Sequence, residues 1–418
     1  MKRSSFFSVL SIVIVAFHAY GQNCSQTSVG LMPLTELGTT NYKGYSGGLY
    51  PLGNNLAPPG HLAAGLSFAM QIVPRNSSGA VDTSNGKIVL LSIGMSNATQ
   101  EFSMFKSLAD ADAAKNPKLV IVDGAQGGQT AAIISDSTAN FWSVIDQRLR
   151  NANVTRAQVQ AAWVKEADAG PTRAFPVHAQ ILSGEMESIA RVLKAKYPNL
   201  KIAYWSSRIY AGYATTTLNP EPFAYESGFA VKWLIEKQIN GDTTLAFAGA
   251  RPKSPWLAWG PYLWADGTKP RQDGFIWECR DFQTDGTHPG PTGRTKVANL
   301  LLAFFKAEVT AASWFLKKNA TGIDATSHQL PYHFRLEQNY PNPFNPATVI
   351  SFQLPVNSRV TLKVFDVNGR EVATLVDGEM TAGNHAVPFA PRATTTGLYF
   401  YQLTAGKFTQ TRKAILMK

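Results

Sequence analysis

The feature that most constrains this chain is an alternation of strand-like and helix-like runs between residues 86 and 315. Four short apolar runs are typical of strands: 88–93, 119–122, 159–164 and 202–205. Helix-like segments lie between or after these strands. One of them places Phe141, Trp142, Ile145 and Leu149 on one face, and the other two cover residues 185–196 and 292–315. Alternating β and α segments bury a parallel sheet under helices on both faces. We therefore expect an α/β domain built on a three-layer, doubly wound parallel sheet.

The last eighty residues have a different character. Short runs of alternating apolar and polar residues cover 349–354, 360–365, 372–376, 385–389, 397–403 and 407–416. Turn residues such as Asn368-Gly369 separate them. This spacing predicts an antiparallel β-sandwich over 336–418, joined to the α/β domain by a polar linker at 316–335.

Composition excludes several classes of protein. The 418 residues are 44% hydrophobic, which supports a folded core, and the net charge of +11 comes from scattered basic residues. Without basic runs that alternate with aromatic residues, we expect no nucleic-acid partner. The charge is typical of a solvated surface, or of attraction to acidic polymers. No His/Cys cluster with metal-ligand spacing occurs, and we predict neither a metal nor a cofactor.

The N-terminus has the pattern of a secretory signal peptide over residues 1–21. Lys2 and Arg3 precede an apolar run at 6–17, and small residues at 19 and 21 suit cleavage before Gln22. That run is too short to span a bilayer, so we expect no integral membrane segment in the mature chain. Two cysteines remain, Cys24 and Cys279; the sequence leaves open whether they form a disulfide or stay as free thiols.

The C-terminal region carries several ordered motifs. They are Leu-Glu-Gln-Asn-Tyr-Pro-Asn-Pro-Phe-Asn-Pro at 336–346, Val-Phe-Asp-Val-Asn-Gly-Arg at 364–370, Gly-Leu-Tyr-Phe-Tyr at 397–401 and the ending Lys-Ala-Ile-Leu-Met-Lys. This region resembles the C-terminal sorting domain of type IX secretion cargo. The resemblance implies an immunoglobulin-like sandwich, the type IX secretion machinery as a partner, and a secreted or outer-surface location. The alternative is a generic immunoglobulin-like accessory module.

Two short stretches in the α/β region carry the residues of a hydrolytic triad. Gly94-Met95-Ser96-Asn97 follows the first strand and opens a helix, and Asp285-Gly286-Thr287-His288-Pro289 precedes the last helix. Serine becomes a nucleophile when a histidine takes its proton, and an acid holds that histidine in the required tautomer. We therefore predict Ser96 as nucleophile, His288 as base and Asp285 as its orienting acid. Asp123 and Asp168 are competing orienters, and Ser96 as a simple helix cap is the structural alternative.

These blocks resemble the SGNH (GDSL-like) hydrolases, with the domain at 22–315 and its core at 86–315. The resemblance implies an oxyanion hole formed by the backbone N–H groups of Ser96 and Gly128. Gln126 and Gln129 are polar residues of the same loop, and we predict that they orient the substrate. A plain glycine-rich turn is the alternative for that loop. The family's third donor is an asparagine, and 163–171 contain none. Glu166 is the nearest counterpart by position in the oxyanion hole, and Lys165 is a predicted substrate contact. The sequence leaves three alternatives open: Glu166 is protonated, Lys165 donates instead, or the hole has two backbone donors alone.

Aromatic residues crowd the stretch just before Asp285, where the Pro/Gly-rich context of 256–264 predicts a loop, and aromatic and basic residues follow the strand at 202–205. Both groups suggest a carbohydrate substrate. We predict substrate contacts from Arg208, Tyr210, Trp256 and Trp259, against the alternative that they pack in the core. The resulting hypothesis is a secreted or cell-surface ester hydrolase that removes acetyl or similar groups from a glycan. The alternatives are a catalytically impaired glycan-binding or adhesion protein with the same fold, and a lipolytic or aryl esterase.

Overall fold

The computed structural model describes residues 21–317 and 334–417, apart from 355, 382, 392–394 and 407. The predicted signal peptide and linker therefore lie almost wholly outside the described residues. The described residues divide into two compact units. The first takes its residues from 21–56, 73–113 and 120–302, and the second from 57–72, 114–119 and 303–417.

One five-stranded parallel sheet forms the centre of the first unit. Its strands are β3 Ile88–Gly94, β4 Leu119–Asp123, β5 Val159–Lys165, β6 Ile202–Trp205 and β7 Trp256–Trp259, in the order β4-β3-β5-β6-β7. Every residue of β3, β5, β6 and β7 is buried. Continuous burial explains why these strands are apolar runs without alternation. Because parallel strands share one direction, their carboxyl ends meet at one edge of the sheet, where sites of such folds form.

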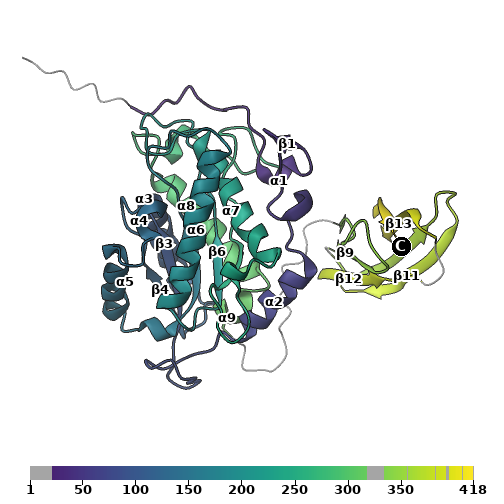
Figure 1. Ribbon diagram of the computed structural model, residues 1–418, viewed down its shortest axis with the longest axis horizontal. Helices are drawn as coiled ribbons and strands as arrows, with labels where there is room; N and C mark the ends of the chain where they lie inside the picture. The colour runs from purple at the N-terminus through teal and green to yellow at the C-terminus, as the bar shows by residue number, and fades with distance from the viewer. Residues whose placement is uncertain are drawn as a thin grey trace, which may run out of the picture. The chain divides into compact units, whose positions relative to one another are not determined.

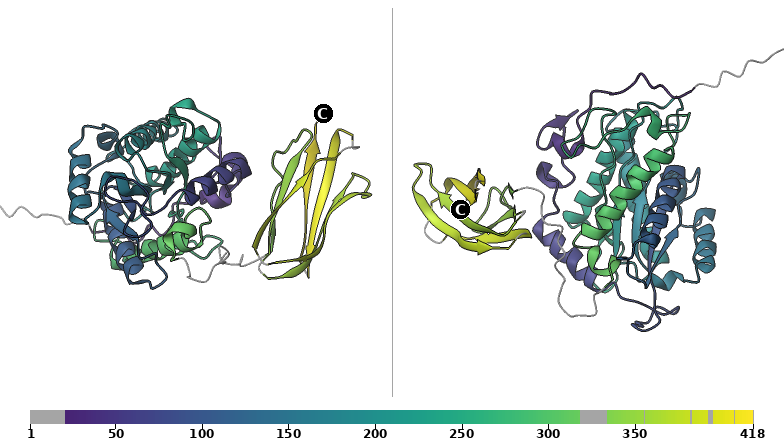
Figure 2. Two further views of the ribbon diagram at one scale, coloured as in Figure 1. Left: turned by 90° about the horizontal axis from the view of Figure 1, so that it is seen from below. Right: turned by 180° about the vertical axis from the view of Figure 1, so that it is seen from behind.

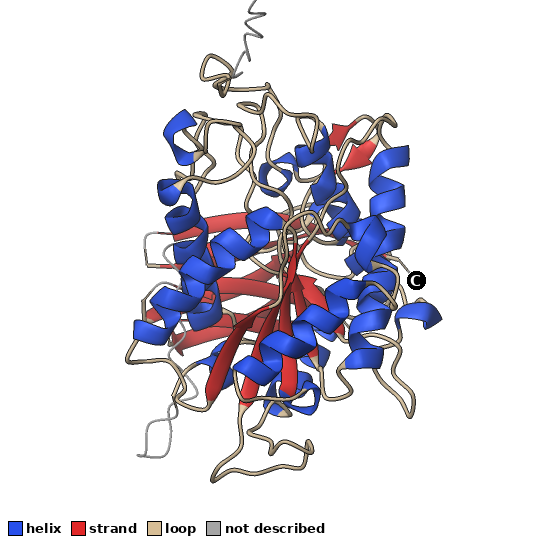
Figure 3. Cartoon of the chain, turned by 90° about the vertical axis from the view of Figure 1, so that its left-hand side faces the viewer, coloured by secondary structure: helices blue, strands red, loops and turns tan. Residues whose placement is uncertain are grey.

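Helices lie on both faces of this sheet (Figure 3). Helices α6 and α7 lie in front of it in Figure 1, and α8 crosses the opposite face in the view from behind in Figure 2. The longer helices are α3 Ser96–Ala111, α5 Asn140–Asn151, α6 Val177–Lys196, α7 Phe223–Ile239 and α8 Pro291–Ala307. The remaining elements of the first unit are α1 Leu34–Leu37, α4 Ala131–Ile134 and the short hairpin of β1 Asn41–Tyr42 and β2 Tyr45–Ser46. In the second unit, α2 Pro59–Met70 and α9 Ala312–Phe315 precede the β-strands.

Three predicted boundaries are corrected. Helix α6 begins at Val177, not at 185, because His178, Ala179 and Leu182 continue its buried face. The predicted helix at 292–315 is two helices: Glu308 accepts hydrogen bonds from Thr310, and the chain turns there before α9. The segment around Trp256 was predicted as a loop from its flanking prolines and glycines, but it forms β7.

The C-terminal strands form two antiparallel sheets (Figure 2, yellow-green and yellow). One has the order β11-β10-β13-β14, with β10 Ser358–Phe365, β11 Glu371–Met380, β13 Gly397–Ala405 and β14 Phe408–Leu416. The other has the order β12-β9-β8, with β8 Arg335–Leu336, β9 Thr348–Leu354 and β12 Gly383–Phe389. Side chains of both sheets, among them Phe352, Leu362 and Tyr401, share one buried core. The predicted antiparallel sandwich is confirmed at this level.

Candidate active site

Ser96 lies where β3 ends and α3 begins. Met95 is in an extended conformation, and Ser96 is the first residue of the helix. Its hydroxyl therefore does not cap α3; Ser96 Oγ lies 2.8 Å from His288 Nε2, within hydrogen-bond distance. The first N–H groups of a helix have no acceptor inside it, so this position combines a hydroxyl with backbone donors and the positive end of the helix dipole.

His288 contacts Asp285 through its other ring nitrogen. Asp285 Oδ2 lies 2.5 Å from His288 Nδ1, and Oδ1 accepts the backbone N–H groups of Thr287 and His288 at 3.0 Å each. Burial pushes the pKa of Asp285 upward, but these hydrogen bonds outweigh it and hold the pKa below its usual value. An ionised Asp285 fixes the proton of His288 on Nδ1 and leaves Nε2 free to accept the proton of Ser96.

The loop that carries His288 and Asp285 is attached to its surroundings at several points. Gly286 has a φ of 63°, and a Cβ atom there would lie 1.9 Å from the carbonyl oxygen of Tyr213. Only glycine fits such an approach in this conformation. The Thr215 N–H donates to Asp285 O at 3.2 Å, and the hydroxyl groups of Thr216 and Thr287 lie 2.7 Å apart. The loop is thereby held against the segment that follows β6.

The glycine-rich loop after β4 lies next to Ser96. A Cβ atom at Gly127 would lie 3.9 Å from Ser96 Cβ, and the Gln126 N–H donates to Gly94 O at 2.9 Å. Gly128, the predicted donor, has a φ of 74° and open space on its Cβ side. Gly127 and Gly128 are both exposed, so their N–H groups lie in a turn that solvent reaches. The sequence resemblance singled out Gly128 and missed the proximity of Gly127.

The predicted substrate contacts of the two glutamines differ in the structure. Gln126 Nε2 donates to the backbone carbonyls of Gly124 and Phe141 at 3.2 and 2.9 Å, so this side chain fastens the loop to α5. Gln129 is half-buried, and its side chain makes no hydrogen bond within the described residues. Of the two, Gln129 alone has a side-chain amide without a hydrogen bond among the described residues.

The structure contradicts the predicted roles of Lys165 and Glu166, the two candidates in the segment 163–171. Lys165 is buried and paired with Glu101 of α3, with Nζ–Oε distances of 2.6 and 2.5 Å. Burial lowers the pKa of Lys165 to about 8, with the Glu101 charge opposing that shift. Glu166 is fully buried, and its carboxyl oxygens have no hydrogen-bond partner of normal geometry among the described residues. Burial raises its pKa well above the usual range, against a smaller effect of the Ala167 N–H. Neither side chain reaches the protein surface.

The competing acids are occupied elsewhere. Asp123 accepts the hydroxyl of Ser92 at 2.6 Å and those of Thr99 and Ser103, which join β3 and α3 to β4. Asp168 Oδ1 accepts the N–H of Ala132 in α4 at 3.1 Å. Among the described acids, Asp285 is the one hydrogen-bonded to His288.

The four predicted aromatic and basic substrate contacts are all buried. Trp256 and Trp259 are 1% and 4% exposed, and Trp259 Nε1 donates to Leu49 O. Tyr210 donates to Gln26 O, and Arg208 is packed near Glu101, Glu221 and Glu166. These residues are packed in the core, as the alternative in the sequence analysis states.

Cys24 and Cys279 form a disulfide with a Cα–Cα distance of 5.3 Å. Cys279 lies nine residues before His288, so the disulfide ties the N-terminal segment to the region of the candidate site.

Within the described residues, no group of three or more His, Cys, Asp and Glu side chains has a geometry that could hold a metal ion. None of the helices in the described part of the chain combines the length and hydrophobicity of a membrane-spanning segment.

Comparison with known proteins separates the two parts of the chain. The model of the family "Secretion system C-terminal sorting domain" matches residues 338–417. No curated protein matches the sequence significantly.

Solved structures give weak similarities. PorZ, a surface component of the type IX secretion system of Porphyromonas gingivalis, is 17% identical over 19% of this chain and 11% of PorZ, with a TM-score of 0.15. The periplasmic domain of the Salmonella ser. Paratyphi A lipopolysaccharide acetyltransferase is 13% identical over 53% of this chain and 84% of that domain, with a TM-score of 0.30. An endo-β-1,4-mannanase double mutant of Cellulomonas fimi is 14% identical over 86% and 70%, with a TM-score of 0.21. All three TM-scores are below 0.5, and we draw no conclusion about this chain from them.

The match over residues 338–417 agrees with the motifs seen in the sequence. A domain of this family directs a chain to the type IX secretion machinery and through it to the cell surface or the outside. Residues 338–417 are thus a type IX secretion C-terminal sorting domain.

Proposed function

We propose that the α/β domain is a serine ester hydrolase of the SGNH type, on a doubly wound sheet, that acts at the cell surface or outside the cell. The observation that carries this proposal is the hydrogen-bonded series Ser96 Oγ–His288 Nε2 and His288 Nδ1–Asp285 Oδ2, at 2.8 and 2.5 Å. A nucleophile, a base and an orienting acid in this order are the parts that acyl transfer requires.

In the proposed reaction, Ser96 Oγ attacks the ester carbonyl while His288 Nε2 takes the hydroxyl proton. The tetrahedral intermediate collapses, the C–O bond to the leaving alcohol breaks, and His288 gives its proton to that alcohol. Water then attacks the acyl-serine, again with His288 as base, and releases the acid and the free Ser96.

The oxyanion that forms in each step needs donors. Support comes from the Ser96 N–H at the start of α3 and from the exposed Gly127-Gly128 turn beside it. We assign the hole to backbone groups of these two segments. The burial of Glu166 and Lys165 removes them as donors, and burial of a neutral Glu166 avoids a negative charge beside the oxyanion.

We propose an acetyl or similar ester on a carbohydrate as the substrate. The sorting domain places the chain where extracellular and surface glycans are found. The site is also accessible: the side chains of His288 and Asp285 are 21% and 31% exposed, which suits a group presented on a large polymer.

The test uses the chain from Gln22 to its C-terminus and the variants Ser96→Ala and His288→Ala. We expect the parent to hydrolyse p-nitrophenyl acetate and to release acetate from acetylated glycans, and both variants to lose at least about a thousandfold in kcat. Equal turnover by all three proteins would refute the triad.

The panel also separates the alternatives. Release from lipid or aryl esters without release from acetylated glycans indicates a lipolytic or aryl esterase. Binding to glycans without turnover of any ester indicates the impaired glycan-binding protein.

A further inference from the structure

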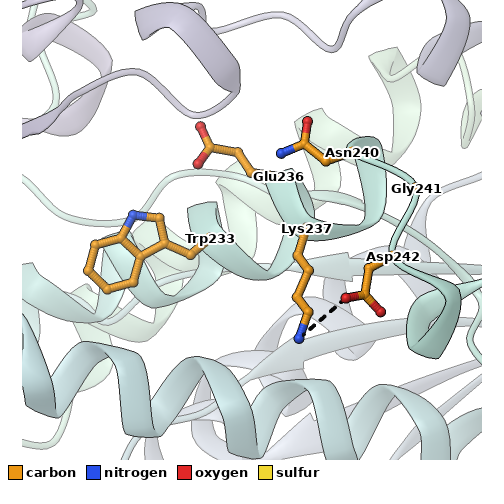
Figure 4. Close-up of a pocket in the computed structure, with 6 residues that line it drawn as sticks. All are labelled: Trp233, Glu236, Lys237, Asn240, Gly241 and Asp242. Atoms are coloured by element: carbon orange, nitrogen blue, oxygen red, sulfur yellow. Dashed lines mark ion pairs between the residues drawn. The ribbon is translucent and has the colours of Figure 1, made fainter.

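One tryptophan differs from all the others in this chain. Eight of the nine are buried in the first or second unit, including both that the sequence suggested as substrate contacts. Trp233, on α7, is half-buried and lines a surface pocket of about 420 Å³. Figure 4 shows its six lining residues, which are Trp233, Glu236, Lys237, Asn240, Gly241 and Asp242.

The spacing of these residues explains the pocket. Trp233, Glu236, Lys237 and Asn240 are three, four and seven positions apart, so they share one face at the end of α7. The chain then leaves the helix through Gly241, which has a φ of 82°. Asp242 follows Gly241, so the end of the helix and the turn after it border an open hollow on the surface.

The Trp233 ring is held rigidly. It packs against the rings of Tyr45, Phe175 and Phe229, with centroid distances of 5.2, 5.7 and 5.9 Å. Its indole N–H makes no hydrogen bond within the described residues. A fixed aromatic surface with a free donor gives up little conformational entropy when a ligand binds.

The polar groups around the ring include unpaired ones. The side-chain amide of Asn240 makes no hydrogen bond among the described residues, and it offers both a donor and an acceptor. Among the described residues, Glu236 has one ion-pair contact, to Lys232 at 3.5 Å, and burial raises its pKa. Lys237 and Asp242 are instead occupied: Lys237 lies 2.7 Å from Glu187 and 3.6 Å from Asp242, which also accepts from Thr244. Among the lining residues, two carboxyl groups outnumber one ammonium group.

We propose that this pocket, the Trp233 pocket, binds an uncharged sugar unit of a glycan. A pyranose has a face of C–H bonds and a rim of hydroxyl groups. The indole surface suits the first, and the Trp233 N–H, the Asn240 amide and the Glu236 carboxyl suit the second. A pocket of this size, with one aromatic surface and a few polar groups, falls in the range of small-ligand sites, about 300–1,000 Å³. The carboxylates disfavour acidic sugars.

The Trp233 pocket is separate from the proposed catalytic site. Helix α7 connects β6 to β7, which run in parallel, so α7 runs back across the sheet and ends near the start of β7. Ser96 follows the end of β3, at the opposite edge of the sheet. A glycan at Trp233 would therefore hold the protein on a polymer while leaving the Ser96 site free.

The test measures binding with the Ser96→Ala variant, so that hydrolysis does not alter the ligand and the result does not depend on the proposed activity. Native gels contain xylan, galactomannan, hydroxyethylcellulose or polygalacturonate. We expect at least one of the three neutral polymers to slow migration. Trp233→Ala should then weaken that retardation at least about tenfold in apparent Kd, and Asn240→Ala less. Polygalacturonate should act on parent and variant alike.

Two further variants guard against misfolding and unspecific effects. Trp233→Phe keeps a ring against Tyr45, Phe175 and Phe229 and should fold, yet lose the indole N–H and part of the binding. Val81→Ala removes an apolar side chain that is 59% exposed and lies outside the pocket, and should bind like the parent. If no neutral polymer slows the parent, or if Trp233→Ala and Trp233→Phe migrate like the parent, the proposal is wrong.

Discussion

The side-chain amide of Asn97 donates a hydrogen bond of 3.0 Å to the backbone carbonyl of Thr287. Asn97 directly follows Ser96 and Thr287 directly precedes His288, so this buried bond joins the helix of the proposed nucleophile to the loop of the proposed base. The bond holds the helix and the loop together next to both catalytic candidates, and it thereby fixes the distance between Ser96 and His288.

Asn97→Ala should therefore lower kcat on p-nitrophenyl acetate by about 10- to 100-fold, since small displacements of reacting groups carry penalties of that order. KM and the melting temperature should change little. The control is Gln100→Ala, which removes another bond of 3.0 Å between α3 and the same region, from Gln283, without touching Thr287. Comparable kcat losses in both variants would contradict a specific role for Asn97.

Gly286→Ala should disorganise the loop that holds Asp285 and His288. The new Cβ atom would have to displace the Tyr213 carbonyl, and the residue would also keep a left-handed conformation. We expect a loss of more than about 3 kcal/mol in unfolding free energy, measured in urea, together with loss of activity.

Gly274→Ala separates the two contributions. Gly274 also has a positive φ, 79°, but a Cβ atom there would have open space. This variant should lose only about 1 kcal/mol, the cost of the backbone conformation alone. Equal losses at the two positions would show that the contact with Tyr213 relaxes freely.

Lys165→Met should destabilise the protein strongly. It leaves the Glu101 carboxylate in the interior without the partner that lies 2.5 Å away, and breaking such a pair costs about 3–5 kcal/mol. The double variant Glu101→Leu/Lys165→Met removes both charges and should recover most of that loss in urea unfolding. A double variant no more stable than Lys165→Met would contradict the interpretation of this pair as a purely structural element.

The sequence predicted the central architecture well where burial is uniform. Strands β3, β5 and β6 are covered on both faces, so their apolar runs coincide with the observed elements to within a residue. It failed at β7, because four residues between a proline and a glycine carry no periodicity; pairing with β6 makes them a strand.

Prediction of the candidate site was also limited by contacts that form only in the folded protein. Ser96, His288 and Asp285 were predicted because the proposed roles require particular residue types at strand and helix ends, and the structure brings the three side chains within hydrogen-bond distance. Arg208 and Tyr210 were misplaced because a position after a strand does not reveal whether a side chain turns outward or into the core. Trp256 and Trp259 were misplaced because their flanking prolines and glycines predicted a loop, whereas they lie in the buried strand β7. Asn97 and Gly127 act through contacts between distant segments, which a single sequence does not show. Trp233 was not predicted as a contact because a single sequence does not show which side of a helix stays partly exposed beside a surface hollow.

Glu185 gives a prediction about pH. Burial, followed by the hydrogen bond and charge of Asp168, raises the pKa of Glu185 to about 8. A glutamate in the unfolded chain titrates near 4.3. Between these values the folded protein keeps a proton that the unfolded chain has released, so this group makes stability fall as pH rises from about 4.5 to about 8.

Glu185→Gln keeps the side-chain volume and a donor toward Asp168 but cannot titrate. Its melting temperature should therefore exceed that of the parent at pH 8.5 and match it near pH 4.5. Glu185→Ala also cannot titrate but loses the hydrogen bond, so it should show the same flattened pH dependence at a lower melting temperature. If Glu185→Gln keeps the slope of the parent between pH 5 and 8, the proton is not held by this pair of carboxyl groups.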